Sequence, residues 1–232
     1  TTLFRSIAAN GGTLQMIHST ITGNSLKTGH AGLFIKDASV EVRNSILWHP
    51  GEMEIDFQEG FIGIEMFEAS GLILSDREFP PDGTSSVTDI RSIDPWLNPD
   101  GLLTSASAAI NSVVRPLNIS DDLHGEIRPN AEVADYGADE FVDVDSDGMP
   151  DWFEIRYNLN PSDPDDADAI APNGMTFLGN YLRAADPNAV YVNPVDDSDS
   201  DGLLNGEESV QNTNPNFPDH PILELESSVS VR

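Results

Sequence analysis

Two stretches of the chain place acidic residues at alternating positions, followed by a glycine and, six residues later, by a glutamate. A calcium-binding loop surrounds its ion with six to eight oxygens, and a twelve-residue turn supplies them from positions 1, 3, 5, 7, 9 and 12. In the first stretch these positions carry the side chains of Asp143, Asp145, Asp147, Asp151 and Glu154, with the backbone carbonyl of Met149 at position 7. Gly148 permits the bend at position 6. This spacing predicts a calcium-binding loop.

The second stretch repeats the pattern from residue 197. Its predicted ligands are the side chains of Asp197, Asp199, Asp201, Asn205 and Glu208 and the backbone carbonyl of Leu203. Like charges crowded into each loop oppose its closure, so we expect folding of this region to be linked to about two structural calcium ions. The alternative is an acidic, solvated linker, which needs neither the glycine nor the final glutamate.

A wider frame, Gly-x5-[Glu/Asn]-x5-[Asn/Asp]-Pro, occurs three times, beginning at Gly148, Gly174 and Gly202. Each copy predicts a loop that leads into about two helical turns, such as residues 150–157. The Asn-Pro or Asp-Pro dipeptide at the end of the frame is expected to end the helix. The middle copy lacks the carboxylates and is not expected to bind an ion alone. Oxygens for a neighbouring site could come from the acidic residues beside it, namely Asp163, Asp165, Asp166 and Asp168.

The chain is strongly acidic, with 40 acidic residues, 11 basic residues and a formal net charge of -29. This charge rules against nucleic acid and anionic membrane surfaces as partners and makes cations the natural counterpart. No apolar run reaches membrane-spanning length, so membrane insertion is not expected. The chain has no cysteine, so bound metal ions and not disulfides are the cross-links that could stabilise its fold. Residues 1–9 lack the layout of a signal peptide, and we interpret the chain as a mature or excised piece of a longer protein.

Short β-rich runs separated by glycine and asparagine fill residues 1–92. Residues 14–21 superpose on residues 40–47 at an offset of 26, with apolar, polar and serine positions in register. A third run, residues 61–67, continues the alternation less regularly. Repeats of this length built from short strands predict a solenoid, so we expect a mainly β fold of the parallel β-helix type. An antiparallel sandwich, whose strands also recur at short intervals, is the alternative.

Four sequence blocks follow one another between residues 93 and 140. They are Ile-Asp-Pro-Trp at 93–96, Ser-Ala-Ala-Ile-Asn at 107–111, Asp-Leu-His-Gly-Glu-Ile-Arg-Pro at 122–129 and Asp-Tyr-Gly-Ala-Asp-Glu at 135–140. In this order they resemble the closing segment of bacterial choice-of-anchor Q surface proteins, although Asn111 stands where that family usually has aspartate. The resemblance covers most of residues 11–141. It implies a right-handed parallel β-helix of the pectate-lyase-like class at the cell surface, with no common catalytic activity.

Residues 143–219 resemble the thrombospondin type 3 repeats and the related dockerin-like calcium motifs of secreted bacterial proteins. The first and third copies of the frame carry this resemblance, because they contain the two complete loops. The resemblance implies that the ions are structural and order the segment.

These observations divide the chain into four parts: incomplete β-helix coils at 1–92, a closing segment at 93–141, loop-helix calcium repeats at 142–219, and an exit segment at 220–232 towards a further domain or anchor. We expect a calcium-stabilised structural or adhesive protein that is secreted or held at the cell surface, with the repeats as a semi-rigid spacer. Its expected partners are calcium and either an extracellular polysaccharide or another surface protein.

The alternative function is a carbohydrate-active β-helix, either a lyase or hydrolase of polysaccharides or a glycan-binding module. A lyase needs a base beside a cation that acidifies the proton next to a uronate carboxyl. The candidates in the first coils are His18, Lys27, His30, Lys36 and Arg43. Solvent-facing or coil-capping roles are the favoured interpretation, because nothing in the sequence fixes the mutual geometry of these residues. We therefore name no catalytic residue.

Overall fold

A computed structural model describes residues 7–23, 32–51, 54–57, 67–75, 85–114 and 119–189. The chain divides into two compact units. The first comprises Thr1–Ala169 and Thr176–Ala185, and the second comprises Ile170–Met175 and Asp186–Arg232. The strands and helices named below all lie in the first unit. Within the described ranges, no helix combines the length and the apolar character needed to cross a membrane.

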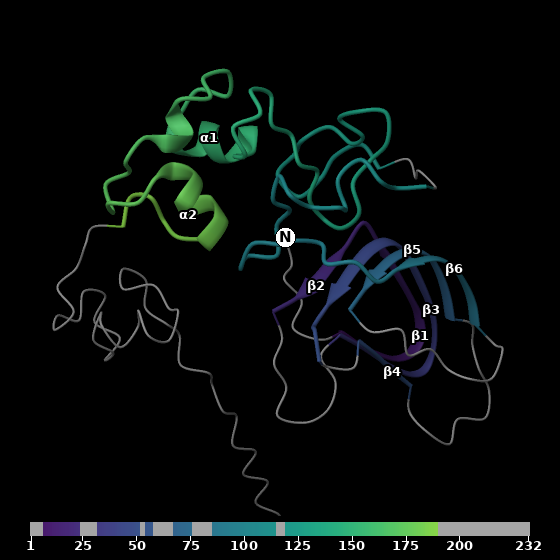
Figure 1. Ribbon diagram of the computed structural model, residues 1–232. Helices are drawn as coiled ribbons and strands as arrows, with labels where there is room; N and C mark the ends of the chain where they lie inside the picture. Colours follow the sequence, from purple (N-terminus) through teal and green to yellow (C-terminus); the bar gives the residue numbers. More distant parts are fainter. Residues whose placement is uncertain are drawn as a thin grey trace, which may run out of the picture. The chain divides into compact units, whose positions relative to one another are not determined.

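The strands of the first unit pair in parallel. They are β1 (Ile7–Ile17), β2 (Thr20–Thr22), β3 (Leu33–Trp48), β4 (Ile55–Phe57), β5 (Phe67–Leu74) and β6 (Ser85–Arg91). The sheet order is β1-β3-β5-β6, and β2 and β4 also pair with β3, so successive strands stack side by side (Figure 1). The described chain is therefore mainly β, as expected, and its named strands form a parallel sheet instead of the antiparallel alternative.

The repeat seen in the sequence is the register of this sheet. Leu14 pairs with Val40 and Ile21 with Leu47, which confirms the predicted offset of 26 residues. β5 adds the next strand to the stack by pairing with β3. Most of the predicted third run, residues 61–66, lies outside the described residues.

Alternate side chains of the strands are buried, since successive residues of a strand point to opposite faces. The main apolar cluster contains Met16, Ile21, Leu33, Val40, Val42, Leu47, Phe67, Leu72 and Leu74. The intervening positions carry polar side chains, and Gln15 donates to the Glu41 carboxylate at 2.6 Å between neighbouring strands. The sheet therefore has one face in the core and one polar face.

A column of residues with left-handed backbone crosses the sheet. His18, Asn44, Gly71 and Asp89 occupy equivalent positions in the register and have φ angles of 43°, 49°, 73° and 55°. Few residues other than glycine adopt this conformation freely. At Gly71 a β-carbon would lie only 2.8 Å from the side-chain oxygen of Asn44. The strands therefore bend at one shared position, where close packing requires a glycine in β5.

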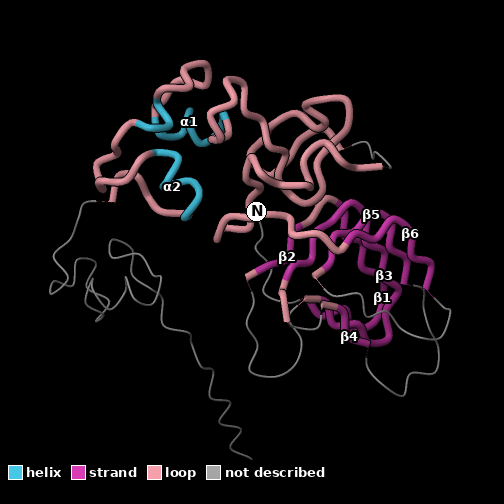
Figure 2. Tube along the Cα trace, in the orientation of Figure 1, coloured by secondary structure: helices cyan, strands magenta, loops and turns pink. Residues whose placement is uncertain are grey.

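Turns and loops follow the sheet in residues 92–114 and 119–150 (Figure 2). They pack on the strands through a second apolar cluster, which contains Ile46, Ile73, Leu103, Ala109, Val113, Ala134 and Tyr136. The fully buried Tyr136 donates its hydroxyl hydrogen bond to Asp89 at 2.7 Å. The guanidinium carbon of Arg91 lies 5.0 Å from the centre of the Tyr136 ring, within cation–π range. Through Tyr136, the loops thus contact the column of bent strand positions.

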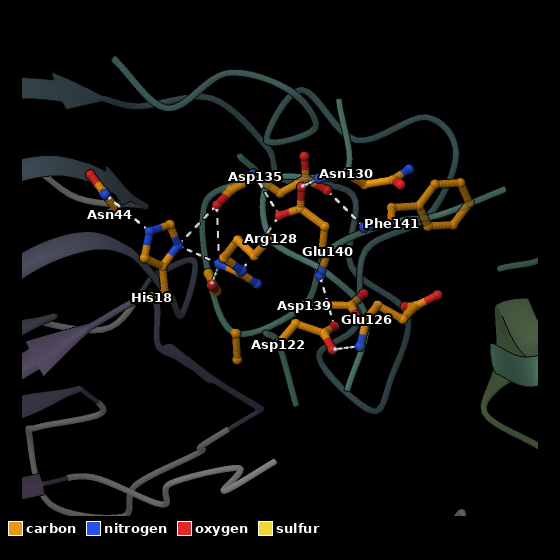
Figure 3. A network of polar contacts seen from close by, with 12 residues as sticks. His18, Asn44, Asp122, Glu126, Arg128, Asn130, Asp135, Asp139, Glu140 and Phe141 are labelled. Atoms are coloured by element: carbon orange, nitrogen blue, oxygen red, sulfur yellow. Dashed lines mark hydrogen bonds and ion pairs between the residues drawn. The ribbon is translucent and has the colours of Figure 1, made fainter. Parts of the chain in front are cut away.

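A buried polar network makes a second attachment between these loops and the strands (Figure 3). The Arg128 guanidinium donates to the Gly137 carbonyl at 2.9 Å and contacts Nδ1 of His18. Nδ1 of His18 also lies 3.1 Å from the Asp135 carbonyl oxygen, and Nε2 lies 3.1 Å from the side-chain nitrogen of Asn44. Nε of Arg128 lies 3.4 Å from the Glu140 carboxylate. His18 is therefore a buried residue of the loop attachment, and burial together with the Arg128 guanidinium lowers its pKa to about 4.

Three short helical segments complete the first unit: α1 (Asp151–Tyr157), the 3-10 helix η1 (Asp166–Asp168) and α2 (Phe177–Arg183). The helix predicted at 150–157 is confirmed by α1, which ends at Asn158 with left-handed backbone. At the start of α2, the Thr176 hydroxyl accepts from the Gly179 amide at 3.0 Å. Side chains from all three segments meet in a third apolar cluster, which contains Leu102, Met149, Phe153, Ala167 and Tyr181.

Candidate metal centre

The first predicted loop is closed by its own carboxylates. Asp143 accepts from the amides of Ser146 at 2.7 Å and Gly148 at 3.0 Å. Asp145 accepts from the Asp147 amide at 3.2 Å, and Asp147 accepts from the Met149 amide at 2.7 Å. These bonds use one oxygen each of Asp145 and Asp147 to hold the turn. Each of these two side chains therefore presents its second oxygen in a fixed direction.

The bend of the loop requires a glycine at its sixth position. Gly148 has a φ angle of 98°, outside the range that residues with a β-carbon readily adopt. It is also buried, and an added β-carbon would lie 3.4 Å from the side chains of Leu178 and Ser105. The glycine thus lets the backbone turn sharply beneath α2, as the predicted loop requires.

Several loop oxygens are buried without a hydrogen-bond partner among the described residues. They are Oδ2 of Asp145, Oδ2 of Asp147 and both carboxylate oxygens of Glu154. Glu154 is 0% exposed, although it lies in the short helix α1. A buried carboxylate with no donor, cation or water costs several kcal/mol, so such oxygens are normally paired or bound to a metal.

The carboxylates gather into two groups that share Asp147. One group is Asp143, Asp145 and Asp147, and the other is Asp147, Glu154 and Asp166; within each group, one oxygen per residue lies within 4.8 Å of the others. Calcium binds its oxygens at about 2.3–2.6 Å, so opposite ligands of one ion lie about 5 Å apart. Both groups therefore match the size of a calcium coordination sphere. Their oxygen-only chemistry suits a hard cation and not zinc, which prefers nitrogen and sulfur.

The electrostatics of the loop also call for a cation. Burial, together with the neighbouring carboxylates of Asp147 and Asp145, raises the pKa of Glu154 to about 8. Burial likewise raises the pKa of Asp147 to about 6, with the Met149 amide acting in the opposite direction. A divalent ion among these groups stabilises their charged forms, because it replaces like-charge repulsion by attraction.

No protein-family model, curated protein or solved structure matches this chain.

Two other predicted ligands of the first loop lie outside the two groups of close carboxylates. Met149 was expected to offer only its backbone carbonyl, and its side chain is fully buried in the third apolar cluster. Asp151 accepts from the Val144 amide at 2.9 Å and belongs to neither group of close carboxylates. The predicted ligands of the second loop, Asp197, Asp199, Asp201, Leu203, Asn205 and Glu208, lie outside the described residues.

A further cluster of possible metal ligands was missed by the sequence patterns. Asp122, His124, Glu126 and Asp139 place one ligand atom each within 4.8 Å of the others. Its members also serve the loop itself: Asp122 accepts from the amides of His124 at 2.8 Å and Glu126 at 2.9 Å. His124 stacks on Trp152 of α1 with 3.7 Å between ring centres. The only sequence signal was the acidic composition around His124, which gives no ligand spacing.

Three of the basic residues considered for a catalytic face are described, and they have different surroundings. His18 is buried in the loop attachment, and Arg43 forms an ion pair with Glu41. Lys36 is seven residues from Arg43 on β3, which corresponds to up to about 23 Å along a strand. The other two candidates, Lys27 and His30, lie outside the described residues.

Proposed function

We propose that this chain is a secreted or cell-surface structural protein, of the β-helix type, whose acidic repeats fold around calcium and act as a semi-rigid spacer. The observation that carries the proposal is the fully buried Glu154, whose two oxygens have no hydrogen-bond partner among the described residues. Such a group is stable as a carboxylate only beside a cation. The twelve-residue spacing with a terminal glutamate favours calcium over magnesium, which prefers to keep its waters.

The closing loops and the calcium loop share a core, which supports a mechanical role for the ion. Leu102 of the closing loops packs in the same apolar cluster as Met149 and Phe153. The Asn98 amide donates to the Tyr181 carbonyl of α2 at 3.0 Å. Calcium that orders the loop would therefore also hold α1 and α2 against the closing loops, which is what a rigid exit from the β-sheet needs.

Two observations support the finer proposal of a right-handed parallel β-helix. The strands pair in parallel, with an offset of 26 residues between β1 and β3 and 27 between β3 and β5, and the bent residues His18, Asn44, Gly71 and Asp89 recur in register. Stacked corners of this kind are expected when a chain coils repeatedly in one direction. The resemblance of the closing segment to choice-of-anchor Q proteins implies the same fold and a location at the cell surface. In that setting, an adhesive role towards a polysaccharide or another surface protein follows naturally.

Thermal unfolding of the full chain in calcium and in chelator tests the proposal. Calcium should raise the melting temperature, and Asp147→Asn should remove most of the rise contributed by the first loop. Asp163→Asn is the matched control, because it makes the same charge change at an exposed position outside the two carboxylate groups. Equal melting with and without calcium would contradict the proposal.

One observation favours a second candidate, a glycan-binding face. A hollow of about 180 Å³ opens on the polar face of the sheet and is lined by Glu41, Arg43, Asn44, Glu68, Ser70 and Thr88. Hydroxyl and carboxylate groups in such a hollow are suited to sugar hydroxyls, although most ligand pockets exceed about 300 Å³. A screen of oligosaccharides against the wild type and Glu68→Gln tests this candidate. Binding that weakens in the variant supports it, and absence of any binding contradicts it.

A further inference from the structure

We infer that Asp166, which lies outside the twelve-residue loop, is a ligand of the calcium ion in the first loop and takes the place that Asp151 has in a self-contained loop. This inference rests on the proposed function, because it assumes that the loop binds calcium. It adds a ligand that the loop spacing does not contain, and it links the first copy of the frame to the segment before the middle copy.

Asp151, the predicted ligand at the ninth loop position, uses one oxygen to close the loop. This oxygen accepts from the Val144 amide at 2.9 Å. Asp151 belongs to neither group of mutually close carboxylates among the described residues, whereas Asp166 belongs to one of them.

Asp166 lies with Asp147 and Glu154 in one group of close carboxylates. One of its oxygens accepts from the Asn160 amide at 2.9 Å, which fixes the side chain. The other oxygen is buried and has no hydrogen-bond partner among the described residues, and one oxygen of Asp166 lies within 4.8 Å of oxygens of Asp147 and Glu154. Glu154 provides the independent sign of a ligand, since it is 0% exposed and neither of its oxygens is hydrogen-bonded within the described chain.

The proposed ligands supply enough oxygens for one calcium ion. Asp143, Asp145, Asp147 and Asp166 would give one oxygen each, Glu154 would give two, and Met149 would give its carbonyl. The total of about seven is within the six to eight that calcium takes. Asp166 thus completes the sphere without a water molecule at the ninth loop position.

Coordination by Asp166 would extend the effect of the ion beyond the loop. Asp166 begins η1, and the next residue, Ala167, is buried against Phe153 and Tyr181 in the third apolar cluster. Calcium would therefore hold η1 against α1 and support the packing of α2. The helix of the middle copy would then be supported by an ion bound in the first loop.

The test is a calcium titration in competition with a chromophoric chelator, using the full chain. A parent carrying Asp197→Asn, Asp199→Asn and Asp201→Asn isolates the first loop. In this parent, Asp166→Asn should weaken calcium binding at least about tenfold, because it removes a charged ligand and keeps an oxygen for the Asn160 amide. Asp165→Asn, an equal charge change one residue away at an exposed position, should leave the affinity within about twofold.

Thermal melts in chelator show whether Asp166 acts as a calcium ligand or stabilises the fold without calcium. As a ligand, Asp166→Asn should melt at the same temperature as Asp165→Asn or higher, since it relieves repulsion in the calcium-free loop. Lower stability in chelator would overturn the inference, because it would show a structural role. Equal calcium affinity of the two variants would also overturn it, while leaving the proposed calcium loop intact. If the parent itself binds no calcium, both the proposed function and this inference fail.

Discussion

The carboxylates of Asp147 and Glu154 approach within 4.8 Å of each other, and three of their oxygens are buried with no hydrogen-bond partner among the described residues. This contact is unfavourable without a cation and favourable with one, because the same charges that repel each other attract a divalent ion. Removing one of these charges should therefore stabilise the region without calcium and destabilise it with calcium.

Glu154→Gln tests this opposition. In chelator, the variant should be more stable than the wild type by about 1 kcal/mol, because a buried like-charge contact is removed. In calcium, it should be less stable, because a bidentate charged ligand is lost. Glu132→Gln, at an exposed position, serves as the control and should change neither melt. Destabilisation in both conditions would indicate a purely structural role for Glu154.

Gly71→Ala tests the column of bent strand positions. Its φ angle is 73°, and the new β-carbon would lie 2.8 Å from Asn44 and 3.1 Å from the Tyr136 ring. Gly12 has a similar φ of 76°, with nothing within 4 Å of an added β-carbon. Both substitutions should cost about 1 kcal/mol for the backbone, and Gly71→Ala should cost about 1–2 kcal/mol more for the clash. Urea unfolding measures both, and equal losses would contradict the close packing.

The bond between Tyr136 and Asp89 should be measurable in a double-mutant cycle. Tyr136→Phe removes the hydroxyl that donates to Asp89 at 2.7 Å and keeps the buried ring. We expect the single variant to lose about 1 kcal/mol in urea unfolding. Because the two side chains interact, Tyr136→Phe and Asp89→Ala together should lose less than the sum of the single losses. Strict additivity would show that the contact contributes nothing.

His18 should make the protein less stable as the pH falls. Burial and the Arg128 guanidinium lower the pKa of His18 to about 4, whereas an unfolded histidine titrates near 6.5. The unfolded chain thus binds the extra proton between these values, and stability is lost as the pH drops from about 6.5 to 4. Nearby Asp135 acts oppositely, because burial raises its pKa to about 7. The Arg128 ion pair with Glu140 also adjoins the network.

A comparison of the wild type with His18→Gln isolates the histidine, since both proteins keep Asp135, Arg128 and Glu140. Chemical unfolding in chelator at a series of pH values gives the difference in stability. From pH 6.5 to 4, the wild type should lose about 1–3 kcal/mol more than the variant. Parallel curves would mean that His18 is not the titrating group.

The parts of the fold that could be predicted from the sequence are those with short, regular spacing. The offset of 26 residues became the register of β1 and β3 because parallel strands stack equivalent positions. The first loop and α1 were predicted because ligand spacing, glycine and helix stop signals all lie within one short segment. Local signals of this kind do not depend on knowing how distant parts of the chain meet.

The remaining features depend on contacts between distant residues. His18 was expected in a solvent-facing or coil-capping role, and the structure places it in a buried network with Arg128, 110 residues away. Asp166 could be noted only as an acidic neighbour, since its approach to Glu154 depends on the packing of η1 against α1. The cluster around His124 forms where a turn meets Asp139 of a later loop. These contacts arise from tertiary packing, and no residue spacing in the sequence predicts them.

The most direct test of the calcium account is a calorimetric titration of calcium into the chelator-treated full chain, alongside Asp147→Asn. We predict about two sites in the wild type, from the two loops that share the twelve-residue spacing, and the loss of one site in the variant. An absence of binding heat, or a variant with the same number of sites and the same affinities as the wild type, would contradict the central claim that the first loop holds a calcium ion.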